Sequence, residues 1–180
     1  MVKDADVRSC PAPSTAARRL IFILVIPALM FLENRSAAAP APAREKPNFS
    51  GVWEVDLQKS KIVPQFKVES GSFAVVHRGN NFHFSRVFVE DGKNDTFAYD
   101  LTTDGKEVVT EEPGQTAHSR LYWDGDVLVY DVRIIRKNGR EATDVVRYSL
   151  HDGGRTFIAE ERSRGPVVNY DNFWVARKRD

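Results

Sequence analysis

Residues 79–92 read GNNFHFSRVFVEDG, and this stretch shows the pattern of most of the chain. It begins and ends with a glycine beside Asn or Asp, residue types that tolerate the positive φ of tight hairpin turns. Between the turns, Phe82, Phe84 and Phe88 fall on one face of an extended strand, and Arg86 interrupts that apolar face. The stretch therefore predicts a β-strand bounded by two chain reversals.

Turn signals of the same kind recur along the rest of the chain at nearly even intervals. Their starts lie 9 to 14 residues apart, which leaves room for one strand between turns but not for an added helix. We interpret each signal as a reversal between antiparallel strands, in an all-β up-and-down meander of about 8–10 strands. The signals are Gly79-Asn80, Asp91-Gly92, Asp104-Gly105, Pro113-Gly114, Asp124-Gly125, Asn138-Gly139, Asp152-Gly153 and Gly165-Pro166.

Apolar side chains alternate along several of these strands, as in Val146, Tyr148 and Leu150. A long antiparallel sheet of this kind must protect its edges, and closing into a barrel removes them. We therefore expect a single antiparallel β-barrel. A sandwich stays open as an alternative, because the same alternation serves both architectures.

The beginning of the chain has the features of an export signal. Arg18 and Arg19 precede a 13-residue apolar run, and small residues follow it up to Ala43. The run is shorter than the roughly 20 residues that a membrane-spanning helix needs. We predict a signal peptide and linker over residues 1–43, cleaved after Ala43 or near Ala38, and a domain over residues 44–180. The alternative is an uncleaved membrane anchor.

Composition excludes several classes of function for the predicted mature chain. Residues 44–180 carry 21 basic and 22 acidic side chains, a formal net charge of −1, so nucleic acid is not an expected partner. The single cysteine, Cys10, precedes the apolar run. The mature domain can therefore form no disulfide, thiolate metal site or cysteine nucleophile.

The predicted domain opens with Asn48-Phe49-Ser50-Gly51-Val52-Trp53, which resembles the Phe-x-Gly-x-Trp start of the calycin superfamily, the lipocalins and fatty-acid-binding proteins. Trp123-Asp124-Gly125 is similar to a late turn of the fatty-acid-binding proteins. The resemblance covers residues 47–178 and implies a barrel closed at one end by Gly51 and Trp53. It also implies a basic partner for that Trp near the last strand, for which Arg177 is the candidate and Lys178 and Arg179 are alternatives.

The chain departs from these families at two positions. Their interior arginine, nine residues after the Trp of the late turn, falls here at Val132, and Arg133 lies one position further. The last strand reads Phe173-Trp174-Val175 where fatty-acid-binding proteins have Arg-x-Tyr. Since a one-residue offset turns a strand side chain to the other face, the resemblance supports the barrel but not a fatty-acid carboxylate clamp.

Candidate ligand-binding residues come from the predicted strands. His118, Arg120 and Tyr122 share one strand face, which suits an acidic or phenolic head group if it faces the lumen; the opposite face, which includes Leu121 and Trp123, is an equally good core face. The candidate set is completed by Tyr130, Arg133, Tyr148 and Phe84.

Histidines and carboxylates give no sign of a metal centre or of catalysis. His77 and His83 flank a turn, but spacing fixes no third ligand, and surface histidines are the simpler interpretation. Glu111-Glu112 and Glu160-Glu161 are adjacent on predicted strands, so the two members of each pair point to opposite faces. We expect no enzyme, no cofactor and no metal.

The sequence therefore favours an exported barrel, periplasmic or secreted, that binds a small hydrophobic ligand in its interior and keeps no membrane anchor after signal cleavage. A protein-binding or inhibitory module, which uses the Ala/Pro-rich lead-in before Asn48, is the second interpretation, and a small barrel enzyme is the third.

Overall fold

The computed structural model describes residues 45–167 and 169–180, so the signal peptide predicted over residues 1–43 lies outside the described residues, as does Cys10. The described residues belong to one unit. Its elements are β1 (Gly51–Val55), β2 (Val68–Arg78), β3 (Asn81–Glu90), β4 (Lys93–Thr102), β5 (Val108–Glu112), β6 (Gln115–Asp124), β7 (Val127–Arg136), β8 (Glu141–His151), the 3₁₀ turn η1 (Asp152–Gly154), β9 (Thr156–Arg164) and β10 (Tyr170–Lys178).

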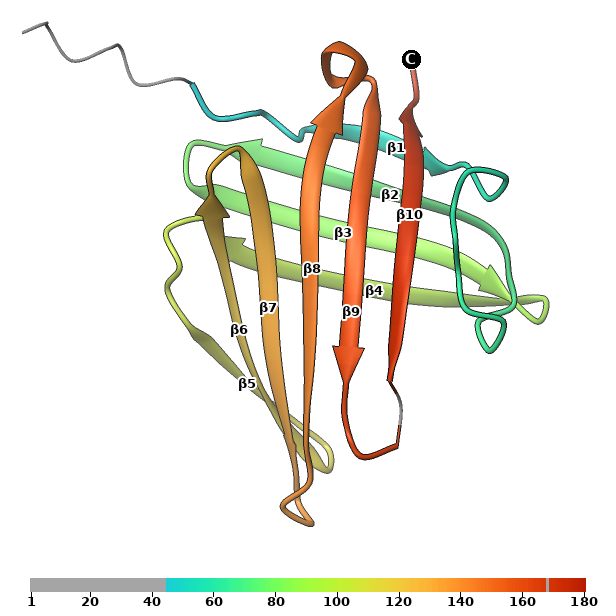
Figure 1. Ribbon diagram of the computed structural model, residues 1–180. Coiled ribbons are helices and arrows are strands. Elements are labelled where there is room, and N and C mark those ends of the chain that lie inside the picture. The colour runs from blue at the N-terminus through green and yellow to red at the C-terminus, as the bar shows by residue number, and fades with distance from the viewer. Residues whose placement is uncertain (1–44, 168) are drawn as a thin grey trace, which may run out of the picture. The chain divides into compact units, whose positions relative to one another are not determined.

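Hydrogen bonding joins these strands in the order β4-β3-β2-β1-β10-β9-β8-β7-β6-β5, with every pairing antiparallel. Figure 1 shows β1–β4 running across the direction of β6–β10, so that the sheet folds over around an interior. The prediction of an all-β, up-and-down antiparallel barrel is confirmed, and the barrel is nearly closed. In the described part of the chain, no helix is long and apolar enough to cross a membrane.

Seven of the eight turn signals connect strands that pair with each other, as predicted. The exception is Asp104-Gly105, because β4 and β5 lie at opposite ends of the sheet order and do not pair. The connection between them is held by β6 instead: Gly105 N donates to Leu121 O at 2.9 Å, and Asp104 forms a bridge with Tyr122. The sheet is therefore open between β4 and β5.

Inward side chains form one apolar cluster that is rich in aromatic rings. Because residues directly opposite each other on paired strands share a face, the pairing of Leu121 with Tyr130 places both on the inner side. The largest fully buried side chains of this cluster are Phe49, Trp53, Phe82, Leu121, Leu128 and Phe157.

Trp53 packs in this cluster at the start of the sheet. Its side chain is fully buried, its Nε1 donates to Phe49 O at 3.2 Å, and its ring centroid lies 5.2 Å from that of Phe157. Gly51 has a φ of +150°, and a Cβ there would lie 2.7 Å from Lys178 Cε. Glycine at this position therefore lets the Lys178 side chain cross the backbone next to the indole.

The basic neighbour of Trp53 is Lys178, which corrects the assignment of Arg177. Lys178 pairs directly with Trp53 in the β1–β10 register, and its Nζ lies 5.4 Å from the indole centroid, a cation–π distance. Arg177 pairs with Glu54 and so projects from the other face, where its Nε donates to Asp56 Oδ2 at 3.3 Å.

Replacing Trp53 with Ala is expected to lower the free energy of unfolding by about 3–5 kcal/mol, because it removes a fully buried aromatic ring and its hydrogen bond. The matched control is Val52→Ala on the same strand, where the side chain is 43% exposed; this change should cost about 0.5 kcal/mol or less. Urea denaturation followed by circular dichroism measures both. Equal, small losses for the two variants would contradict this account of the core.

Candidate functional site

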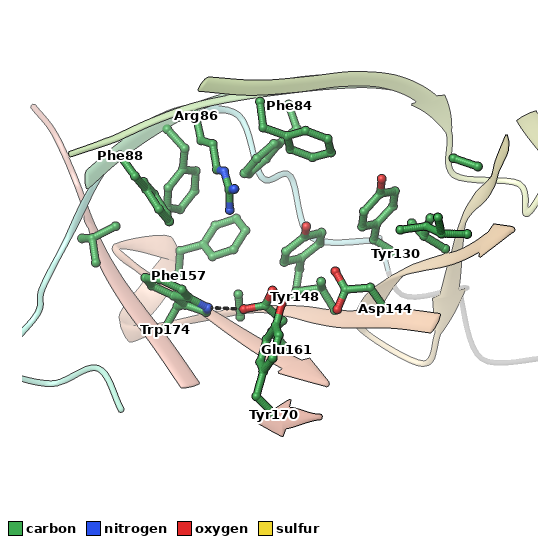
Figure 2. A pocket seen from close by; sticks show the side chains of 18 of the residues that line it. Phe84, Arg86, Phe88, Tyr130, Asp144, Tyr148, Phe157, Glu161, Tyr170 and Trp174 are labelled. Carbon is green, nitrogen blue, oxygen red and sulfur yellow. Dashed lines mark hydrogen bonds between the residues drawn. The ribbon is translucent and has the colours of Figure 1, made fainter. Parts of the chain in front are cut away.

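A cavity of about 400 Å³ lies on the inner side of the sheet, and Figure 2 shows it from close by. Its walls come from both halves of the barrel, with β1–β4 on one side and β5–β10 on the other. The lining residues are Val55, Phe73, Phe84, Arg86, Phe88, Phe97, Glu112, Gln115, Ala117, Tyr130, Val132, Ile134, Asp144, Val146, Tyr148, Phe157, Ala159, Glu161, Tyr170 and Trp174.

Stacked aromatic rings make up much of the cavity wall. The ring of the lining residue Tyr130 is nearly parallel to that of Tyr99, which is not itself a lining residue, with centroids 4.4 Å apart, and the Phe84 ring stacks on Tyr148 at 6.2 Å. The Tyr99 hydroxyl donates to that of Tyr148 at 3.3 Å. Burial raises the pKa of Tyr130 to about 12 and that of Tyr148 further, so both hydroxyls are neutral at physiological pH.

Glu161, on the inner face of β9, is the most fully hydrogen-bonded polar group of the cavity. Its Oε1 accepts from the Tyr170 hydroxyl at 3.1 Å. Its Oε2 accepts from Asn172 Nδ2 at 3.0 Å and from Trp174 Nε1 at 2.8 Å, the bond drawn in Figure 2. Because three side chains of β10 hold it, this carboxylate is a fixed negative charge in the wall.

Asp144 is a further carboxylate in the wall, beside Glu112 and Glu161, and one of its oxygens has no partner among the described residues. It shares the inner face of β8 with Val146 and Tyr148, and its Oδ1 is buried without a hydrogen bond to any described residue. Burial, together with the negative charge of Glu161, raises the pKa of Asp144 to about 7, while Arg86 acts in the opposite direction. The side chain therefore changes charge near neutral pH.

Arg86 supplies the positive charge of the cavity from the inner face of β3. Its Nη2 donates to Asp95 Oδ2 at 2.9 Å, and its guanidinium carbon lies 4.7 Å from the Phe88 ring centroid. Its Nε is buried and has no hydrogen-bond partner among the described residues. The guanidinium is thus held in place by Asp95 and Phe88 while one donor stays unpaired.

Three of the residues predicted from sequence, Phe84, Tyr130 and Tyr148, line the cavity. His118, Arg120 and Tyr122 do not, and the expectation that their face is the lumen is corrected. Leu121 and its alternating neighbours point inward on β6, so these three side chains project outward. There His118 lies 3.2 Å from Glu107, and Arg120 donates two hydrogen bonds to Asp131.

Arg133 is also outside the cavity, as a one-residue offset from the interior position requires. Val132 lines the cavity, while Arg133 projects to the other face of β7 and lies 3.9 Å from Glu141. The interior arginine of this chain is Arg86, on a different strand.

The two histidines of the β2–β3 hairpin point to opposite sides. His77 pairs with Phe82, is buried, and accepts a hydrogen bond from Phe49 N on Nδ1 at 3.5 Å; burial lowers its pKa. Its buried position corrects the interpretation as a surface histidine. His83 is exposed beside Asp100. Across residues 45–167 and 169–180, no group of three or more His, Cys, Asp or Glu could hold a metal ion.

The polar groups that distinguish this cavity, Arg86, Asp144 and Glu161, are absent from the predicted site. Each follows the inward alternation of its strand: Arg86 lies between Phe84 and Phe88, and Asp144 precedes Val146 by two residues. The sequence signal for such a group is a charged residue at a strand position where the period-two alternation predicts an apolar, inward side chain. It was visible for Arg86, which interrupts an aromatic face.

Comparison with solved structures identifies the type of barrel. Secretory abundant heat soluble protein 4 from Ramazzottius varieornatus matches with 14% identity and a TM-score of 0.51, over 77% of this chain and all of its own. A second secretory abundant heat soluble protein from the same organism matches with 12% identity and a TM-score of 0.50, over 72% of this chain and 94% of its own. The fold is of the calycin type.

At this level of identity the likeness shows the fold alone. No protein-family model matches the chain, and no curated protein matches it. What this calycin barrel can bind must therefore be argued from its own cavity, in which aromatic rings surround Arg86, Asp144 and Glu161.

Asp144→Asn is expected to stabilise the protein above pH 7. Since the folded-state pKa of Asp144 is raised to about 7 from 3.8, the folded state binds more protons between these values, and the stability contributed by this group falls as pH rises. The variant should be more stable than the parent by about 1–3 kcal/mol at pH 8, with almost no gain at pH 4.

Urea denaturation at the two pH values measures this difference. The matched control is Asp91→Asn in the β3–β4 turn, where the carboxylate is 68% exposed and paired with Lys67; its effect should be small at both pH values. A gain for Asp144→Asn that is absent at pH 8, or equal at both pH values, would show that Asp144 is not a buried, proton-binding group.

Proposed function

We propose that this protein binds a small, mostly apolar ligand non-covalently inside its barrel. The observation that carries the proposal is the cavity of about 400 Å³, with walls made mainly of aromatic and aliphatic side chains. Ligand sites in proteins typically enclose about 300–1,000 Å³ and combine apolar walls with a few polar groups. Phe84, Tyr130 and Tyr148 are the sequence-predicted binding residues that we retain.

The apolar wall would supply most of the affinity, because burial of ligand surface is worth about 25 cal/mol per Å². The polar groups would orient the ligand. A barrel whose lumen was filled by its own side chains would instead favour a protein-binding module, and the cavity argues against that alternative.

We further propose that binding involves no turnover. Among the described residues that line the cavity there is no Ser, Thr, Cys or Lys, and the one hydroxyl bonded to a carboxylate, that of Tyr170 on Glu161, has its pKa raised by burial, which makes it a weak nucleophile at neutral pH. Mass spectrometry of ligand recovered after prolonged incubation tests this, and a new product would overturn it.

The proposal of export rests on the sequence of residues 1–43. Expression of the full chain in a bacterial host, followed by separation of periplasm from cytoplasm and N-terminal mass determination, tests it. A periplasmic product that begins near residue 39 or 44 supports export, and a full-length cytoplasmic product contradicts it.

Nile red, an uncharged apolar dye, tests interior binding directly. Its fluorescence should rise on titration with the parent protein and saturate at one dye per chain. Ala117→Phe places a ring in the cavity and should weaken dye binding by roughly tenfold or more, since the ring occupies the space that the dye needs.

The matched control is Ala98→Phe, the same substitution at an exposed position of β4 that does not line the cavity. It should leave dye affinity unchanged. If Ala98→Phe and Ala117→Phe weaken the dye equally, or neither does, the dye is not bound in the interior and the proposed function fails.

A further inference from the structure

Two buried polar atoms in the cavity wall lack hydrogen-bond partners among the described residues. They are Nε of Arg86, a donor, and Oδ1 of Asp144, an acceptor. These two atoms are the unpaired buried side-chain polar atoms found in the described part of the chain, and both residues line the same cavity. Because buried polar groups are normally paired, these atoms mark where a ligand would form hydrogen bonds.

The charges around these atoms are unequal. The positive charge of Arg86 is matched by Asp95, whose Oδ2 accepts from Nη2 at 2.9 Å. Glu161 is held by the neutral donors of Tyr170, Asn172 and Trp174, and within the described part of the chain no cationic group donates a hydrogen bond to Glu161 or to Asp144. Once Asp144 is ionised, the interior wall is therefore net negative.

A negative wall disfavours the head group of a fatty acid. A ligand carboxylate placed near Asp144 would meet two like charges, at Asp144 and Glu161, in a partly buried site, where repulsion is stronger than in open water. Moreover, the acceptor Oδ1 of Asp144 needs a donor, which an ionised carboxylate does not have. A hydroxyl or an ammonium group can donate the hydrogen bond that this oxygen lacks.

We propose that the ligand of this cavity is an amphiphile with a hydrogen-bond-donating head group that carries no negative charge, an alcohol or an amine, and that Asp144 receives this head group. The proposal rests on the interior binding proposed above and adds the ligand's chemical class. The apolar part of the ligand lies against the aromatic walls, which include Phe84, Tyr130 and Trp174.

The two head groups differ in their hydrogen-bonding capacity. A hydroxyl donates one hydrogen bond, which Asp144 Oδ1 can accept, and it can also accept one from a donor in the wall. An ammonium group only donates, and it gains from the negative charges of Asp144 and Glu161 and from the faces of nearby rings. The relative affinities of an alcohol and an amine therefore show which of the two head groups the cavity prefers.

Competition among ligands of equal chain length tests the proposal. The full chain is loaded with Nile red at pH 8, and decan-1-ol, decylamine and decanoate are compared as competitors below their aggregation concentrations. The alcohol or the amine should displace the dye at a concentration roughly tenfold lower than decanoate. If decanoate competes as well as or better than both, the proposal is overturned.

Asp144→Asn removes the charge and keeps the size of the side chain. In this variant decylamine should lose roughly tenfold in affinity and decanoate should bind no worse than before, each value being corrected for the variant's own affinity for Nile red. The exposed Asp91→Asn control should retain the parent order of the three competitors. An unchanged order in Asp144→Asn would show that this residue does not receive the head group.

The design separates failure of this inference from failure of the proposed function. If Nile red does not bind the parent protein, the interior does not take apolar molecules and both proposals fall. If Nile red binds and decanoate is the best competitor, interior binding stands and the ligand class proposed here is wrong.

Discussion

The barrel depends on one pairing between strands that are distant in the sequence, that of β1 with β10. The other pairings in the described sheet join consecutive strands. The register from Trp53–Lys178 to Val55–Ala176 is the strand ladder that joins β1–β4 to β5–β10, and an isolated bridge between Lys61 and Phe173 adds to it. The Trp53 ring anchors this link, since it packs on Phe73 of β2 and Phe157 of β9. The cavity lies between the two halves and therefore exists because this short ladder forms.

Inside the barrel, the arrangement of polar groups favours function over stability. Glu161 has three hydrogen-bond donors, as a structural carboxylate should, but Asp144 is partly buried with an unpaired, buried oxygen, and its pKa is raised to about 7. An apolar residue or an amide at position 144 would serve the fold better. Sites that lower stability in this manner are commonly those that bind, because the ligand supplies the missing partner.

Period-two alternation predicted the fold and the inner faces of β3, β7 and β8, because one face of each strand is clearly more apolar. On β6 the alternation did not predict the inner face, because the face that contains Leu121 and the face that contains Tyr122 both mix apolar and polar residues. The pairing of Leu121 with Tyr130 shows that the face of Leu121 is the inner one. The prediction from sequence also failed at Asp104-Gly105, since turn chemistry fixes a reversal but not the pairing of its flanking strands.

Interior binding can be observed directly by NMR, from nuclear Overhauser effects between unlabelled decan-1-ol and the methyl groups of isotopically labelled protein. The account predicts contacts from the ligand chain to Val132 and Val146, whose side chains line the cavity. Contacts confined to outward valines such as Val52 and Val87, which are both 43% exposed, would contradict it.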